Sequence, residues 1–343
     1  MGKTRSMLRK KKYDEARSRI TINDGVGSWS DLNHDILFLV MTKLGFADFI
    51  AFSGVCNSWR SFAVSNRNSF MVSIPPMPIS ISNSTTDANE KQYCLKDSQG
   101  RKMKTIVPHS AKRLCIGVTC GYLILLGEET KDFWLVNLIT RHELHFPDVP
   151  DEYFCCPRDA KGILVFSPSI SEWLFLVFTG CFFCKIFVSI AGKREWTCVS
   201  SPFSIHDLVA FKGKIYTLHV TGICEMKLYP EPKLVLLETK NILNLDSRFM
   251  EFVTSGENLY VIDRLSKHPY TILEIDLDQM KWVSPKKTCE EYVFFRSNTN
   301  SANHRSLYDG RYVVEDKNGK GGCLYASMWY FFFDCLNVDI IHE

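Results

Sequence analysis

Residues whose spacing could support metal binding or redox chemistry occur in one apolar part of the sequence. Cys181 and Cys184 have the Cys-x-x-Cys spacing of zinc and redox sites. A zinc site needs a second closely spaced pair of ligands, and the adjacent Cys155 and Cys156 have the wrong spacing for one. Cys181 and Cys184 also flank two phenylalanines, so we interpret them as thiols of a buried strand rather than as metal ligands.

A neighbouring histidine and aspartate and a pair of aspartates are the other candidates for chemistry. His206 and Asp207 could be acid–base partners, but adjacent residues of a strand point to opposite faces of the sheet. Asp276-x-Asp278 resembles the start of a calcium loop, but the required downstream Gly and Glu spacing is missing, so we expect a turn. The sequence has no P-loop, no dinucleotide-binding glycine motif and no His-Glu-x-x-His. We therefore expect no catalytic residues, no metal site and no cofactor, and a protein that is not itself an enzyme.

The overall composition is that of a soluble globular protein. The chain has 343 residues, of which 45% are hydrophobic and 23% charged, enough for one large domain or two of ordinary size. Its 13 cysteines and its charged amino terminus, which lacks an apolar stretch, indicate a reducing compartment, so we expect a cytoplasmic and/or nuclear location. The longest apolar run, Trp173 to Cys184, is shorter than the about 20 residues of a membrane helix. Thr179-Gly180 divides that run into two predicted strands, and we expect no transmembrane segment.

Positive charge is concentrated at the amino terminus. The formal charge of the chain is +3, and residues 1–22 alone contribute +6, which leaves −3 for the remainder. We predict a disordered basic tail over residues 1–26 and no nucleic-acid-binding face. Within this tail Arg9 to Lys12 could act as a nuclear import signal, and Met1-Gly2-x-x-x-Ser6 matches the N-myristoylation pattern. We rank both below a free, solvated tail.

Short amphipathic helices are predicted after this tail, in a domain spanning residues 27–72. Two groups of apolar residues recur at steps of three and four, with a break at Gly45. The first group comprises Leu32, Ile36, Leu37, Val40 and Leu44, and the second comprises Phe49, Ile50, Phe52, Val55, Cys56, Trp59 and Ala63. Ser30 or Asp31, and then Asp48, stand where side-chain caps of the two helices belong. Helices this short cannot enclose a core alone, so we expect part of their apolar surface to contact another domain or protein.

The same stretch resembles the F-box, a helical motif. The resemblance rests on Trp29-Ser30-x-Leu32-x-x-Asp35-Ile36-Leu37 and on the ending Val55-Cys56-x-x-Trp59-Arg60-Ser61. In two departures, Asn33 stands where most F-boxes have proline, and Gly45-Phe46 replaces the usual break. The resemblance implies binding to the adaptor Skp1 and, through it, to a cullin. The residues expected to line that contact are Leu32, Ile36, Leu37, Val40 and Leu44, with Val55, Cys56 and Trp59 either reaching the adaptor or packing within the motif.

A linker and an all-β domain are predicted for the remainder. Three prolines in Ile74 to Pro78, followed by a polar run from Ser80 to Asn89, predict a linker over residues 73–92. Beyond it, short β-type runs follow glycines separated by 41, 51, 43 and 54 residues, namely Gly121, Gly162, Gly213, Gly256 and Gly310. Spacings of about 40–50 residues are typical of β-propeller blades. We expect these glycines to serve turns that need positive φ, and aromatic residues such as Trp196 to pack between sheets. An irregular β-sandwich is the alternative.

The β-rich part also resembles a known family. Thr119 to Leu123, Leu135 to Arg141 and Phe146-Pro147 are similar to plant F-box proteins with a KIB-type β-propeller of unknown function, and Asp207 to Tyr216 and Phe252 to Leu259 continue the match. Tyr122 replaces a tryptophan of that pattern and Leu138 a proline, and the match is less clear from Met328 to Asp334, where the ring of blades should close.

The predicted fold is α+β by chain, with a small all-α F-box domain followed by an all-β propeller over residues 93–343. The resemblance implies a substrate receptor of an SCF-type cullin–RING ubiquitin ligase, which binds Skp1 through the F-box and an unknown target protein through the propeller. The alternative is a non-ligase scaffold whose F-box-like segment packs on its own propeller.

Overall fold

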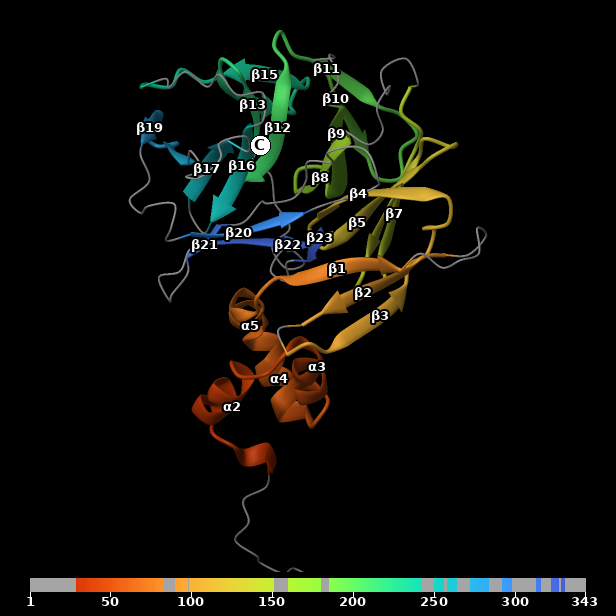
Figure 1. Ribbon diagram of the computed structural model, residues 1–343, viewed down its shortest axis with the longest axis vertical. Helices are drawn as coiled ribbons and strands as arrows, with labels where there is room; N and C mark the ends of the chain where they lie inside the picture. The colour runs from red at the N-terminus through yellow and green to blue at the C-terminus, as the bar shows by residue number, and fades with distance from the viewer. Residues whose placement is uncertain are drawn as a thin grey trace, which may run out of the picture. The chain divides into compact units, whose positions relative to one another are not determined.

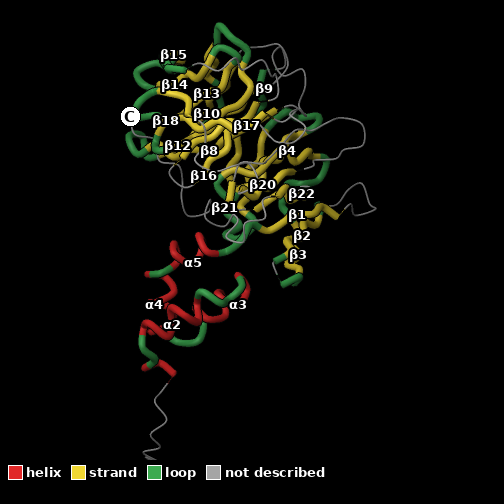
Figure 2. The backbone as a smooth tube through the Cα atoms, turned by 60° about the vertical axis from the view of Figure 1, so that its left-hand side comes forward, coloured by secondary structure: helices red, strands yellow, loops and turns green. Residues whose placement is uncertain are grey.

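The computed structural model divides the chain into two compact units, Met1–Phe70 and Met71–Glu343 (Figure 1). The structure describes residues 29–82, 90–97, 99–150, 160–179, 185–241, 250–255, 258–263, 272–283, 292–297, 313–315, 322–326 and 328–330. The predicted basic tail and the Cys181–Cys184 pair lie outside these residues. Helices belong to the amino-terminal part of the chain and strands to the rest (Figure 2), which confirms the predicted class. No helix within the described ranges is long and apolar enough to cross a membrane.

Short helices build the first unit, and the last of them runs across the boundary between the units. They are the 3-10 helix η1 (Trp29–Asp31) and the α-helices α2 (His34–Met41), α3 (Phe46–Ser53), α4 (Asn57–Ser65) and α5 (Arg67–Ser73). The break predicted at Gly45 is confirmed, because this glycine is the N-cap of α3 in an extended conformation. Within the second unit, the described strands form six sheets.

The first three sheets each have four antiparallel strands. In spatial order, the first sheet contains β23 (Met328–Tyr330), β1 (Met77–Ser82), β2 (Gln92–Lys96) and β3 (Lys102–Ile106). The second contains β4 (Arg113–Thr119), β5 (Tyr122–Gly127), β6 (Phe133–Asn137) and β7 (Glu143–Phe146). The third contains β8 (Ala160–Ser167), β9 (Glu172–Thr179), β10 (Lys185–Ile190) and β11 (Thr197–Ser200). Strand β9 confirms the first of the two strands predicted in the longest apolar run. The second, predicted after Thr179-Gly180, lies outside the described residues, and β9 pairs instead with β10, which follows that run.

The remaining sheets continue this pattern up to the last, which has three described strands. The fourth contains β12 (Ile205–Phe211), β13 (Lys214–His219), β14 (Gly222–Lys227) and β15 (Lys233–Leu236). The fifth contains β16 (Met250–Ser255), β17 (Asn258–Asp263), β18 (Ile272–Asp276) and β19 (Lys281–Val283). The sixth contains β21 (Val313–Glu315), β20 (Tyr292–Ser297) and β22 (Gly322–Ala326), with β20 and β22 parallel.

One strand from each sheet contacts a strand of the next, so the sheets form a closed ring. The contacts run from β23 to β4, β8, β12, β16 and β21, and β20 returns to β23. Figure 1 shows β8, β12 and β16 side by side. This arrangement is the predicted β-propeller. Strands such as β5 are buried along their whole length because each sheet is covered on both faces by its neighbours.

The predicted linker over residues 73–92 is wrong for Met77–Ser82, which forms β1. This strand pairs with β2 on one side and with β23, from the carboxyl-terminal part, on the other. Met77 lies opposite Tyr330 and Ile79 opposite Met328, and all four side chains are buried. The buried residues Met77 and Ile79 alternate along β1, a strand pattern that the surrounding prolines and polar residues concealed. The ring therefore closes with strands from both ends of the domain.

The glycines that mark the repeat serve two purposes. Gly121 and Gly213 have φ values of +75° and +73°, which confirms the predicted turns. Gly162 instead lies inside β8, where a Cβ would come within 2.6 Å of the Phe175 ring. Glycine is required here because the Phe175 ring leaves no room for a side chain, and not because the backbone turns. Gly256 and Gly310 lie outside the described residues.

Aromatic and aliphatic side chains fill the spaces between neighbouring sheets. Between the second and third sheets, the Trp196 ring lies 6.0 Å from that of Phe133 and 6.1 Å from that of Phe175, measured between centroids. Its indole nitrogen donates a hydrogen bond to the Pro147 carbonyl, 3.2 Å away. These contacts confirm the predicted place of Trp196 between two sheets.

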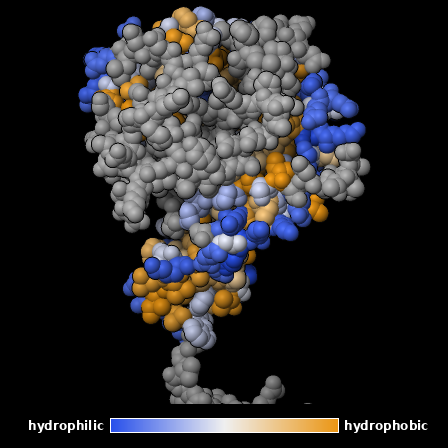
Figure 3. Space-filling view, in the orientation of Figure 1, coloured by the Kyte–Doolittle hydropathy of each residue, from blue (hydrophilic) through white to orange (hydrophobic). Residues whose placement is uncertain are grey.

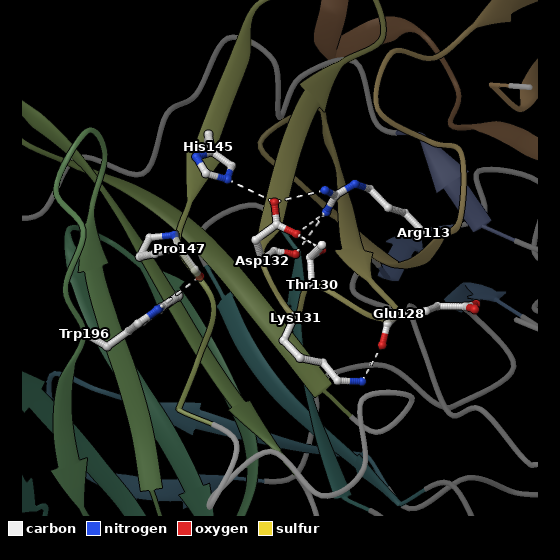
Figure 4. A network of polar contacts seen from close by, with 8 residues as sticks. All are labelled: Arg113, Glu128, Thr130, Lys131, Asp132, His145, Pro147 and Trp196. Carbon is white, nitrogen blue, oxygen red and sulfur yellow. Dashed lines mark hydrogen bonds and ion pairs between the residues drawn. The ribbon is translucent and has the colours of Figure 1, made fainter. Parts of the chain in front are cut away.

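A charged cluster joins the ends of strands in the second sheet. Figure 4 shows Arg113 and His145 on two sides of Asp132, which accepts hydrogen bonds from both at 2.7 and 3.0 Å and another from Thr130. Burial by itself raises the pKa of Asp132, but the hydrogen bonds from Arg113, Thr130 and His145 outweigh it and lower that pKa to about 2.

A second charged cluster is buried where the third, fourth and fifth sheets meet. The Lys161 ammonium lies 2.9 Å from an Asp207 oxygen and 3.3 Å from a Glu251 oxygen, and all three side chains are at least nine-tenths buried. Asp207 also accepts the backbone N–H groups of Leu208 and Phe252 at 2.8 Å each. Because these residues belong to β8, β12 and β16, one ammonium holds three sheets together.

We expect Lys161→Met to lower the free energy of unfolding by about 3–5 kcal/mol, because it leaves two buried carboxylates without their cation. Urea unfolding of the full chain measures this loss. The matched control is Lys214→Met, since Lys214 is 47% exposed and pairs with Glu225, which Lys227 also contacts. An exposed pair contributes less than about 1 kcal/mol. Equal losses in the two variants would contradict a special role for the buried ammonium.

The Asp132 cluster makes stability depend on pH. A carboxyl whose pKa falls from 3.8 to about 2 on folding stabilises the folded state above pH 4 and loses this effect as the pH falls toward 2. We expect Asp132→Asn to cost about 2 kcal/mol at pH 5, and the difference from the unmodified protein to shrink on acidification. Urea unfolding of both proteins at several pH values between 5 and about 2 gives the difference in free energy of unfolding directly. A difference that stays constant over this range would be inconsistent with the lowered pKa.

Candidate functional site

The candidate site is an apolar surface of the helical unit, and a core of aromatic side chains supports it. Phe49 and Phe70 stack with ring centroids 3.8 Å apart, and Phe52 meets Phe62 edge to face at 6.4 Å. The buried residues of the helices as far as Phe70 are Leu37, Met41, Phe46, Phe49, Phe52, Phe62, Ala63 and Phe70. This core fixes which side of each helix remains outside.

Helix α2 is apolar on more than the side that it buries. Leu37 and Met41, four residues apart, have no exposed surface. Ile36, Leu39 and Val40, spaced by three and four, are 48%, 65% and 38% exposed. We call these three residues the α2 face. Helices that are apolar all round are normally covered on every side, so the α2 face has the composition of a contact surface.

Other apolar side chains of the unit are exposed as well. Trp29 in η1, Ile50 in α3 and Val55 after α3 are each more than half exposed. Figure 3 shows hydrophobic residues gathered over the side of the helical unit that faces the viewer. Exposed apolar area of this kind marks a site of interaction in a protein that is otherwise well packed.

The structure places the eight predicted contact residues in three environments. Ile36, Val40 and Val55 are exposed, whereas Leu32, Leu44, Cys56 and Trp59 are half-buried. Leu37 differs from the expectation, because its side chain has no exposed surface and lies in the core of the unit. The predicted contact set omitted five exposed apolar residues of the unit, namely Trp29, Phe38, Leu39, Ile50 and Val64. Leu39 lies three positions after Ile36, so the spacing itself could have identified it.

The expected cap of the first α-helix is wrong. Asn33, and neither Ser30 nor Asp31, is the N-cap of α2, and its side-chain oxygen accepts the backbone N–H of Asp35 at 3.0 Å. The φ of Asn33 is −58°, which a proline ring would also adopt. The asparagine that replaces the usual proline therefore preserves the start of the helix and adds a side-chain cap. Asp48 lies in the first turn of α3 rather than at its cap.

Cys56 and Trp59 have structural roles at the start of α4. The Cys56 sulfur accepts the backbone N–H of Trp59 at 3.5 Å and serves as the N-cap. The Trp59 indole donates a hydrogen bond to the Trp29 carbonyl at 2.8 Å, and its ring lies 4.6 Å from that of Phe52. These contacts support packing within the motif for both residues. A contact of either one with a partner stays a prediction.

Arg60 connects α4 to the end of α3. Its Nε donates a hydrogen bond to the Ser53 carbonyl, 3.3 Å away, in the last turn of α3. Carbonyls at a helix C-terminus have no partner in the helix and attract cations. The basic residue at the end of the motif thus orients α3 against α4.

The residues that suggested other chemistry have structural roles where the structure describes them. Asp207 belongs to the buried cluster with Lys161. The Asp276 side chain accepts the backbone N–H groups of Asp278 and Gln279, which confirms the predicted turn. Within the described ranges, no group of three or more His, Cys, Asp or Glu side chains is arranged to hold a metal ion.

Each of the two units matches a known protein family in sequence. Residues 29–70 match the F-box domain and residues 92–334 match the KIB1-4 beta-propeller. The F-box protein At2g17036 of Arabidopsis thaliana is 25% identical over 68% of this chain and 64% of its own length. The probable F-box protein At4g22165 of the same plant is 21% identical over 70% of this chain and 69% of its own length. The chain thus spans about two thirds of these curated relatives.

Solved structures resemble the chain less closely. AztD from Citrobacter koseri aligns with a TM-score of 0.33 and 15% identity over 61% of this chain and 57% of that one. The WD40 domain of SCAP from fission yeast aligns with a TM-score of 0.33 and 11% identity over 67% of this chain and 59% of that one. Scores this low carry no argument. The family match covers well over half of the sequence, and its β-propeller and F-box coincide with the two units of the structure. The chain is therefore an F-box protein of the KIB1-4 β-propeller family.

Proposed function

We propose that this chain is the substrate-receptor subunit of an SCF-type cullin–RING ubiquitin ligase. In this role the helical unit binds Skp1, and through it the cullin, while the propeller holds a target protein. The observation that carries the proposal is the α2 face, where Ile36, Leu39 and Val40 are exposed on a helix that already buries Leu37 and Met41.

Burial of the α2 face would supply useful binding energy. Full burial of one such aliphatic side chain contributes about 1.5–3 kcal/mol, and each of the three is now partly exposed. Association itself costs about 4–15 kcal/mol in lost motion, so three side chains are too few for a stable complex. Ile50 and Val55, both 53% exposed, are the next candidates for the contact.

The match to the F-box domain supports a Skp1-type adaptor as the partner for this surface. The proposed protein contributes no covalent step. It raises the effective concentration of the target near the ubiquitin-loaded enzyme, as any bivalent linker does for the groups that it connects. A receptor of this kind needs two separate binding surfaces, and the chain has two compact units.

We expect the double variant Ile36→Ala, Leu39→Ala to bind Skp1 at least about tenfold more weakly, because each substitution removes apolar area that the partner would cover. Isothermal titration of the purified full chain with Skp1 measures the change. The matched control is Ile106→Ala, another exposed apolar residue (56%), which lies at the end of β3. Retention of full affinity by the double variant would count against the adaptor contact, and so would an equal loss in the control.

Stability separates the core residue from its exposed neighbour. We expect Leu37→Ala to lower the stability of the helical unit by about 2–5 kcal/mol, because it leaves a cavity under α2. Ile36→Ala, at a position that is 48% exposed, should cost less than about 1 kcal/mol. Hydrogen exchange of the α2 and α4 backbone amides reports both values in the full chain. Similar exchange rates in the two variants would show that α2 does not bury the side assigned to it.

A further inference from the structure

Two neighbouring sheets of the propeller enclose a cleft. It lies between the third sheet, β8–β11, and the fourth, β12–β15, and has a volume of about 370 Å³. Its walls come from the β8–β9, β10–β11 and β14–β15 turns and from the strand ends beside them. The lining residues are Ile170, Glu172, Leu174, Val188, Ile190, Lys193, Thr197, Leu228, Tyr229 and Pro232.

The floor of this cleft is the open end of a packed core. Leu174 and Val188 are 5% and 6% exposed and belong to the apolar cluster between the two sheets. Ile190 and Leu228 are half-buried against the same cluster. An apolar group that entered the cleft would therefore extend existing packing and leave water on one side only.

The rim of the cleft carries two side chains of opposite charge that have no partner among the described residues. Glu172 opens β9 and Lys193 lies in the β10–β11 turn, and both are exposed. In the part of the chain that the structure describes, neither side chain forms a hydrogen bond or an ion pair. Tyr229, 60% exposed, stands on the fourth-sheet side. A ligand can thus meet a carboxylate, an ammonium and an aromatic ring around an apolar centre.

We propose that this cleft binds an extended segment of the target protein. The segment inserts one bulky apolar side chain between the sheets and places a basic residue at Glu172 and an acidic residue at Lys193. This inference rests on the proposed receptor function, since it assigns the place where the propeller holds its target.

The arrangement favours a peptide segment over a small molecule. An apolar pocket surrounded by exposed polar groups is the usual anatomy of a protein–protein contact. Small-molecule sites instead enclose the polar groups that orient the ligand, and here both charges are exposed. Pro232 also leads directly into β15, the outer strand of the fourth sheet, where Val235 and Leu236 are 39% and 50% exposed. An extended chain could follow that edge beyond the cleft.

Selection of a phage-displayed library of random linear peptides on the full chain tests the proposal. We expect the selected peptides to share a bulky apolar residue flanked by a basic and an acidic one. Thr197→Trp, which fills the cleft from an exposed position, should reduce their affinity more than about tenfold. Fluorescence anisotropy of labelled synthetic peptides measures this change.

Charge reversal tests the two rim residues separately. Glu172→Lys and Lys193→Glu should each weaken the selected peptides about threefold to tenfold at low salt, and exchange of the peptide's charges should restore binding to the double variant. The control is Glu129→Lys, an exposed acid in the β5–β6 turn of another sheet, which should change nothing.

Three results would overturn the inference: selected peptides without a shared motif, selected peptides that bind the Thr197→Trp variant with full affinity, or an apolar dye that binds in the cleft although no peptide is selected. The last result would identify a small-molecule site. Skp1 titration distinguishes the two proposals. If Skp1 binds and no peptide does, only the cleft assignment fails, whereas peptide binding without Skp1 binding would contradict the ligase role alone.

Discussion

The pairing of β1 with β23 is the contact on which the propeller depends. Described strands such as β5 are buried along their whole length between neighbouring sheets, so a ring with a gap would expose the apolar faces on either side of it to water. Main-chain hydrogen bonds between strands from opposite ends of the domain prevent that gap. Met77, Ile79, Met328 and Tyr330 are all buried at this seam, so apolar packing and strand pairing stabilise the same closure.

In the helical unit, by contrast, apolar surface is left exposed. Its short helices have a common aromatic core, but α2 has more apolar residues than one core can cover. The excess is the α2 face. Two polar devices keep the helices in place without using that face: Asn33 caps α2, and Arg60 joins α4 to the end of α3. The contact surface is therefore supported by residues that need not touch a partner.

Charges in the propeller follow the same division between structure and recognition. Lys161, Asp207 and Glu251 are buried and fully engaged with one another, so they hold sheets together and are unavailable to ligands. Glu172 and Lys193 lie at the mouth of a cleft, are exposed, and have no partner among the described residues. Desolvation is costly for the first set and small for the second, which is why only the second suits a reversible contact.

The sequence by itself determined the two-domain order, the repeat of the blades and the F-box, because periodicity, glycine spacing and a motif are local signals. Only the tertiary structure decided that Leu37 is core and Leu39 is surface, since both are apolar residues of one short helix. It also decided that Met77–Ser82 is a strand: its partner β23 is more than two hundred residues away, and no local pattern reports such a pairing. The cleft between the third and fourth sheets depends on turns from separate blades, which only the packing of one sheet on the next brings together.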